Sequence, residues 1–159
     1  MIILGIDPGI RITGFGVIEK GKKGLKQIAF GEIKNRRGSP LSVCLKTIFD
    51  SLVAVVERWH PQAVAIEDIF YGKNVKSLIT QGHARGVAIL AAPCNNIPVC
   101  EYTPLEVKKA VVGYGRAEKR QVQQMVKAIL DLSETAPPDA SDALAVAICH
   151  AHFQKTETF

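Results

Sequence analysis

The first nine residues, Met1-Ile-Ile-Leu-Gly-Ile-Asp-Pro-Gly9, constrain the fold more than any other stretch of the chain. Four of the first six are large and aliphatic, which is typical of a strand buried on both faces, and the run stops at Asp7. A carboxylate at the end of a central strand must be paired, hydrogen-bonded or metal-bound to offset its desolvation. A cap on the Asp-Pro-Gly turn is the alternative role for Asp7.

The residues after this turn predict two further antiparallel strands. Thr13 to Val17 fits a strand that is entered through a hairpin, whose glycines let other groups approach the backbone closely. Residues 20–24 form a turn, and the alternation from Leu25 to Ile33 predicts the third strand. Three antiparallel strands therefore come first.

The rest of the chain alternates between helices and short strands. A helix is expected from Ser39-Pro40 to His60, followed by a buried strand, Ala63–Ile66, that stops at Glu67 and Asp68. Because a strand after a crossover helix lies parallel to its predecessor, Glu67 should reach the same sheet edge as Asp7. The remaining expected elements are helices at 75–92, from 103, at 117–130 and at 139–153, and a strand at 97–102.

Length and composition indicate one globular domain, residues 1–159, with a frayed tail at 154–159. No apolar run approaches the ~20 residues of a membrane span, and residues 1–6 are too short for a signal peptide, so we expect a cytoplasmic protein. Four scattered cysteines without a C-x-x-C pair are expected to be reduced thiols, mostly buried: Cys44, Cys94, Cys100 and Cys149.

The formal net charge is +5, from 20 Lys and Arg against 15 Asp and Glu, which is compatible with a polyanionic partner. The basic residues fall into four clusters, at residues 20–26, 34–37, 73–76 and 108–120. A solvated surface is the alternative interpretation of the first two clusters.

Acids also open the last helix, where Asp139 and Asp142 share one face because they are three residues apart. For this segment alone, a helix cap that complements the helix dipole is the simpler interpretation. However, three separate segments now place acids at strand or helix ends: Asp7, Glu67 with Asp68, and Asp139 with Asp142.

Carboxylates that converge at one sheet edge repel each other unless divalent cations neutralise them, and oxygen ligands suit Mg²⁺ or Mn²⁺. Four carboxylates can hold two ions about 4 Å apart, an arrangement that promotes in-line phosphoryl displacement. The sequence has no candidate thiolate nucleophile, P-loop or G-x-S-x-G motif, which leaves metal-activated water to attack a phosphodiester.

Six motifs along the chain together resemble the RuvC family of bacterial Holliday-junction resolvases. They are G-I-D-P-G-x-x-x-T-G-x-G at 5–16, A-I-E-D-x-F-Y-x-K-N at 65–74, G-H-A-R-G at 82–86, Y-T-P-x-x-V-K at 102–108, A-E-K at 117–119 and D-A-S-D-A-L-A at 139–145. The resemblance covers essentially the whole chain and implies an RNase H-like α/β fold: a five-stranded mixed sheet, three antiparallel strands first and then parallel strands, flanked by helices.

The same resemblance implies the metal ligands. Asp7 would bridge two Mg²⁺ ions, with Mn²⁺ as an expected substitute, and Glu67 and Asp142 would complete the ligation. Asp139 would hold the position where relatives carry Asp or His. Asp68 is expected to point away from this site. The implied reaction is the symmetric nicking of two strands of like polarity at a four-way junction, which leaves 5′-phosphate and 3′-hydroxyl ends.

Contacts to DNA follow from the resemblance as well. Phe70, and less directly Tyr71, would stack on an unpaired base at the junction centre. Lys108 and Lys119 would lie beside the scissile phosphate, or contact the DNA backbone non-specifically. The full expected set of DNA-contacting residues is Phe70, Tyr71, Lys73, Asn74, Lys76, Lys108, Arg116 and Lys119, and Lys119 is also expected to take part in catalysis.

The helix at 75–92 resembles the dimer helix of the family, and Gly82 and Gly86 would let a partner approach closely, although packing within the subunit is an equal alternative. His83 departs from the Gln expected before Ala-Arg-Gly. A two-fold homodimer would present two identical sites to a four-way junction. Resemblance also implies cooperation with the RuvA–RuvB branch-migration complex.

Three other functions fit parts of the sequence. An actin-like or Hsp70-like ATPase also begins with a strand, an acid and a glycine-rich hairpin, but it needs two lobes and 159 residues supply one. A junction-binding protein without turnover would use the same basic surfaces, although the presence of all four acids favours catalysis. An RNase H-like nuclease with another nucleic-acid substrate is the third.

Overall fold

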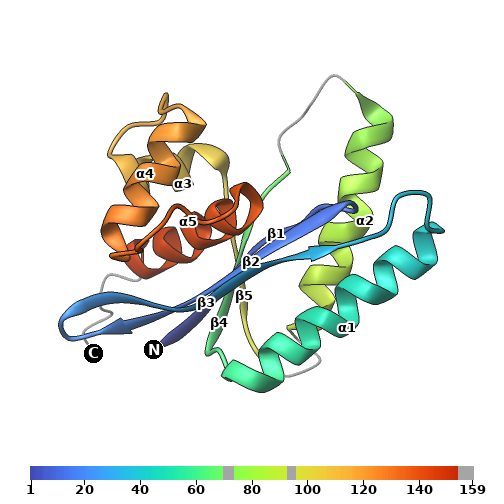
Figure 1. Ribbon diagram of the computed structural model, residues 1–159, viewed down its shortest axis with the longest axis horizontal. Coiled ribbons are helices and arrows are strands. Elements are labelled where there is room, and N and C mark those ends of the chain that lie inside the picture. Colours follow the sequence, from blue (N-terminus) through green and yellow to red (C-terminus); the bar gives the residue numbers. More distant parts are fainter. Residues whose placement is uncertain (70–73, 93–95, 154–159) are drawn as a thin grey trace.

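The computed structural model describes residues 1–69, 74–92 and 96–153. Within them a central sheet separates two layers of helices (Figure 1). The tail at 154–159, which we expected to be frayed, lies outside the described residues.

The sheet has the strand order β3-β2-β1-β4-β5. β1 pairs antiparallel with β2, and β2 antiparallel with β3, whereas β4 is parallel to β1 and β5 is parallel to β4. This confirms the expected three antiparallel strands followed by parallel ones. The bounds are β1 Ile2–Asp7, β2 Ile12–Gly21, β3 Gly24–Lys34, β4 Ala63–Glu67 and β5 Val99–Tyr102.

Helices cover both faces of this sheet (Figure 1). The first two helices of the chain, α1 and α2, pack on one face around Leu4 and Ile6. The last three, α3, α4 and α5, pack on the other face around Ile3 and Ile18. The bounds of these helices are α1 Leu41–Trp59, α2 Val75–Ala91, α3 Pro104–Val112, α4 Lys119–Ile129 and α5 Pro138–Phe153.

The predicted second strand was too short, and the predicted fifth strand was too long. β2 continues four residues beyond the predicted Val17, because its pairing with β3 resumes after a register shift between Val17 and Ile18 and runs to the turn at Gly21. β5 begins at Val99 rather than at residue 97, since its pairing with β4 starts there. Neither change moves an acid away from the end of its strand.

The alternation of side chains along β1 decides which way Asp7 faces. Leu4 and Ile6 belong to the core beneath α1 and α2, while Ile3 belongs to the core beneath α5. Because successive side chains in a strand point to opposite faces, Asp7 follows Ile3 and Gly5 and lies on the α5 side of the sheet.

Glycines in β1 and β2 let the backbone of α5 lie directly on the sheet. A Cβ atom on Gly5 would stand 2.0 Å from the carbonyl oxygen of Ala143, and one on Gly14 would stand 1.9 Å from that of Asp139. Such distances exclude any side chain at these positions. The glycines therefore set how closely the start of α5 approaches the sheet. Because Gly14 pairs with Asp7, this close contact lies next to Asp7.

The described residues can be compared with what we expected of the cysteines and of membrane-spanning segments. Cys44 and Cys149 are buried, Cys100 is half-buried, and all three are free thiols, whereas Cys94 lies outside the described part of the chain. None of the described helices is both long enough and apolar enough to cross a bilayer.

Replacing Gly5 by Ala tests the contact between α5 and the sheet. The added methyl group must displace the α5 backbone, so we expect Gly5→Ala to lower the free energy of unfolding by about 1–3 kcal/mol or more. Urea unfolding measures the change. Gly21→Ala is the matched control, because the nearest atom to its added methyl group in the described part of the chain would be the carbonyl oxygen of Gly24, 3.9 Å away. Equal stability of the two variants would contradict this description of the packing.

Candidate functional site

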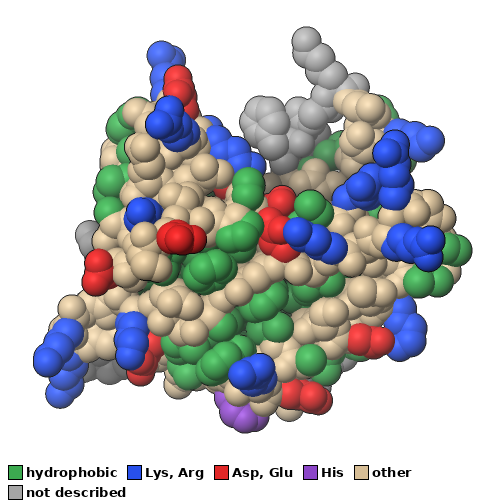
Figure 2. Space-filling view, in the orientation of Figure 1, with side chains coloured by type: hydrophobic (Ala, Val, Ile, Leu, Met, Phe, Trp, Pro, Cys, Tyr) green, Lys and Arg blue, Asp and Glu red, His purple; other side chains and the backbone are tan. Residues whose placement is uncertain are grey.

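The structure brings the four predicted acids to the carboxyl edge of the sheet. Asp7 and Glu67 end the adjacent parallel strands β1 and β4, whose register pairs Ile6 with Ile66 just before them. Asp139 and Asp142 lie in the first turns of α5, which packs on the same face of the sheet. Acidic side chains gather in the hollow between α5 and α2, with basic side chains on its two sides (Figure 2).

The turn after Asp7 is held by Thr13, a buried residue at the start of β2. The backbone N–H of Gly9 donates to Thr13 Oγ1 (3.3 Å), and this hydroxyl donates to the carbonyl oxygen of Gly9 (2.7 Å). The Gly9 amide of the Asp-Pro-Gly turn is thus bound by Thr13 and not by Asp7. This arrangement disfavours the turn-capping role for Asp7.

Burial and mutual repulsion raise the pKa values of the two strand-end acids. Burial, followed by the negative charges of Asp142, Glu67 and Asp139, raises the pKa of Asp7 to about 7. Burial and the charge of Asp142 likewise raise the pKa of Glu67 to about 7, although Lys119 opposes both shifts. Fully ionised, the cluster therefore needs additional positive charge.

Lys119, at the start of α4, supplies one positive charge. Its Nζ lies 2.8 Å from Asp142 Oδ2, and this hydrogen bond raises the pKa of the lysine. Lys119 and Lys108 line a cavity of about 210 Å³ together with Glu67 and Asp142. The structure thus places two of the expected DNA-contacting lysines beside the acids.

Arg85 of α2 holds the end of β4, a role that the sequence analysis did not assign. Its Nε donates to the carbonyl oxygen of Glu67 (3.4 Å), and its Nη2 pairs with Asp68 Oδ1 (3.4 Å) and with Glu101. Asp68 therefore faces α2 and, as expected, points away from the acidic cluster. The G-H-A-R-G motif was the available signal for Arg85, while His83 is exposed on the same helix.

A further acid near the cluster, Glu32, was also missed. Glu32 of β3 lies opposite Gly14, which in turn lies opposite Asp7, and its side chain is 10% exposed. Burial, followed by the charge of Glu32, raises the pKa of Asp139. Lys34 pairs with Glu32 at 3.1 Å. The sequence did not single out Glu32, because an isolated acid within a strand is common. Only the pairing of β3 with β2, and of β2 with β1, places Glu32 in line with Asp7 across the sheet.

The donor set of the cluster fits divalent cations. Among the described residues, no group of three or more His, Cys, Asp or Glu is close enough together to hold a metal ion. The four acids nevertheless repel one another, and carboxylate oxygens are the ligands that Mg²⁺ and Mn²⁺ prefer. Cations that offset this repulsion can draw the carboxylates together, and the two-ion arrangement stays a prediction.

Other expected DNA contacts are only partly within the described residues. Phe70, Tyr71 and Lys73 lie outside them. The Asn74 side chain accepts hydrogen bonds from the backbone N–H groups of residues 76 and 77 and so caps α2. Arg116 is exposed between α3 and α4.

Asp7→Asn tests the repulsion within the cluster. Because the pKa of Asp7 is raised from 3.8 to about 7 in the folded protein, ionisation of Asp7 lowers the stability of the wild type as the pH rises through this range. The amide variant lacks this contribution and keeps only that of the other acids, such as Glu67. We expect the variant to be more stable than the wild type by on the order of 1–3 kcal/mol at pH 8, with the difference shrinking towards pH 4. Urea unfolding in EDTA measures this.

Asp50→Asn, which removes an exposed carboxylate on α1, is the matched control for the loss of one negative charge. A stability difference for Asp7→Asn that does not grow between pH 4 and pH 8 would contradict the electrostatic description.

Comparisons with known proteins agree with this architecture. The family model described as "Crossover junction endodeoxyribonuclease RuvC" matches residues 3–150. A relative of that name from Syntrophotalea carbinolica is 58% identical over 96% of this chain and 94% of its own. One from Desulforamulus reducens is 49% identical over 98% of this chain and 96% of its own. The structure of Thermus thermophilus RuvC in complex with Holliday junction substrate matches with a TM-score of 0.90 and 35% identity, covering 96% of this chain and 94% of that one. The RNase H-like fold is thereby confirmed, and the chain belongs to the RuvC family.

Proposed function

We propose that this protein is a structure-selective endonuclease that resolves four-way DNA junctions by paired, symmetric nicks in homologous recombination and repair. Family membership supports the reaction class, and a relative of the same fold is known in complex with Holliday junction substrate. The observation that carries the proposal is the convergence of four acids from β1, β4 and α5, with two lysines beside them.

In this proposal Asp7, Glu67, Asp139 and Asp142 hold two Mg²⁺ ions per subunit, for which Mn²⁺ can substitute. When bound, the ions activate water and stabilise the attacking and leaving oxygens of a phosphodiester. The burial of Asp7 and Glu67 limits the surrounding water and strengthens their interactions with cations.

The lysines of the cavity have a separate task. Lys119 and Lys108 approach the acids from α4 and α3, where their ammonium groups can pair with phosphate oxygens and neutralise charge that develops during cleavage. Lys119 now contacts Asp142, so it can move from this carboxylate to a phosphate when the acids are neutralised otherwise. The stacking role of Phe70 and Tyr71 stays a prediction.

A homodimer is the second part of the proposal, and the exposed face of α2 supports it. Val75, Ile79 and Leu90 are 67%, 56% and 54% exposed, and Gly82 and Gly86 lie on the same helical face. A Cβ on Gly86 would have no neighbour within 4 Å among the described residues of the subunit, which favours a partner over internal packing at this glycine. Two symmetric sites would match a four-way junction, and the RuvA–RuvB complex is the proposed further partner.

The catalytic assignment predicts that neighbouring acids behave differently. Asp7→Asn and Glu67→Gln should each lower the Mg²⁺-dependent cleavage rate by at least about a hundredfold, because each removes a metal ligand, while junction binding stays within about twofold. Asp68→Asn is the matched control and should cut at nearly the wild-type rate. Cleavage of a labelled four-way junction, a linear duplex and an RNA–DNA hybrid measures rate and selectivity.

Cleavage by Asp7→Asn at the wild-type rate with Mg²⁺ would show that the metal assignment is wrong. Preferential cutting of the RNA–DNA hybrid by the wild type would instead favour another nuclease of this fold. Tight binding of the junction without any cleavage would favour a junction-binding protein.

The dimer assignment predicts that Gly86→Glu produces a monomer. The new carboxylate fits within the subunit but would place charge in the centre of the apolar face of α2. Sedimentation velocity should find a wild-type dimer and a monomeric variant that no longer makes paired nicks. Leu105→Glu, which adds the same charge to a residue of α3 that is 51% exposed, should remain a dimer. A dimeric Gly86→Glu protein would exclude this interface.

A further inference from the structure

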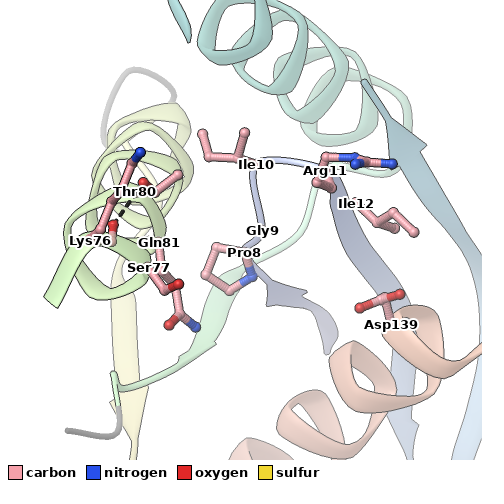
Figure 3. A pocket seen from close by; sticks show the side chains of 10 residues that line it. All are labelled: Pro8, Gly9, Ile10, Arg11, Ile12, Lys76, Ser77, Thr80, Gln81 and Asp139. Carbon is pink, nitrogen blue, oxygen red and sulfur yellow. Dashed lines mark hydrogen bonds between the residues drawn. The ribbon is translucent and has the colours of Figure 1, made fainter. Parts of the chain in front are cut away.

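A second hollow, of about 520 Å³, surrounds the turn at residues 8–12 that follows Asp7. In Figure 3, the α2 side chains Lys76, Ser77 and Thr80 stand on one side of this turn, and Arg11 and Asp139 stand on the other. Asp139 belongs both to this hollow and to the acidic cluster, so the hollow opens onto the proposed site. The mechanism proposed above does not use it.

Two positive side chains without an ion-pair partner in the described part of the chain line this hollow. Arg11 and Lys76 are exposed, and neither forms an ion pair with any residue in the described part of the chain. By contrast, Lys34, Lys46, Arg85 and Lys119 all have carboxylate partners there. Two unpaired cations on opposite walls of one hollow fit a polyanion that spans it.

The position of the two hollows relative to the acids indicates what this polyanion is. The cavity with Lys108 and Lys119 contains Asp142, while the hollow with Arg11 and Lys76 contains Asp139, one turn earlier on α5. A nucleic-acid strand whose scissile phosphate lies at the acids continues in both directions. Cationic walls on both sides can hold the phosphates before and after the cut.

We infer that the hollow around the 8–12 turn, which α2 and Asp139 also line, binds the backbone of the cleaved DNA strand next to the scissile phosphate, and that Arg11 pairs with a phosphate adjacent to the cut. This inference rests on the proposed function and adds a binding position to it. A guanidinium can bind two phosphate oxygens at once, so Arg11 also sets the register of the strand.

Arg11→Gln removes the charge while keeping a polar side chain on an exposed position. In EDTA we expect it to weaken binding to a four-way junction about three- to tenfold and to reduce the slope of log affinity against log salt by about 1. Arg58→Gln is the matched control: Arg58 lies at the far end of α1, next to the start of β4 and so at the opposite sheet edge. It should bind as the wild type does, and Arg11→Lys should keep most of the affinity.

A phosphate scan identifies the partner of Arg11. Junctions carry one neutral methylphosphonate at a time, placed symmetrically at the positions that flank the mapped cuts. One flanking substitution should weaken binding by the wild type and by Arg58→Gln, yet cause no further loss for Arg11→Gln, because that variant has already lost the contact.

The inference would be overturned if each flanking methylphosphonate weakened junction binding by Arg11→Gln as much as it weakens binding by the wild type. This result would leave the proposed junction cleavage intact. Wild-type protein that neither binds nor cuts the junction would overturn the proposed function and this inference with it. The two failures are therefore distinguishable in one set of experiments.

Discussion

Repulsion among half-buried carboxylates is the constraint on which the rest of this structure depends. Acids from three elements meet at one sheet edge, and their burial together with their mutual repulsion raises the pKa values of Asp7 and Glu67 to about 7. Folding alone does not favour such a cluster, since each charge costs desolvation energy that apolar neighbours do not offset. The packing of the surrounding elements must hold the acids in place.

That packing is concentrated on α5. Nearly every residue from Ala140 to Ala151 is buried, and the helix backbone lies on the glycines of β1 and β2. A helix held so closely has little freedom to move its first turn away from Asp7. The stability of the core thus balances the electrostatic cost of placing Asp139 and Asp142 beside the strand ends.

The two faces of the sheet divide the basic residues by role. Arg85 approaches from the α2 side, contacts the Glu67 backbone and neutralises Asp68, so it orients β4 without entering the cluster. Lys119 approaches from the α5 side and contacts Asp142 directly. Adjacent acids in the sequence, Glu67 and Asp68, consequently have different partners, because the alternation of a strand sends them to opposite faces.

The sequence by itself determined the order and type of the elements, the strand-end position of Asp7 and Glu67 and the shared face of Asp139 and Asp142, because these features follow from local periodicity. Only the tertiary structure decided that Glu32 lies in line with Asp7 across the sheet and that Arg85 holds β4. It also decided that Arg11 and Lys76 face one hollow, where neither has a carboxylate partner among the described residues. Each of these depends on strand register or on the packing of one element against another, and residues far apart in the chain carry no local pattern that records such contacts.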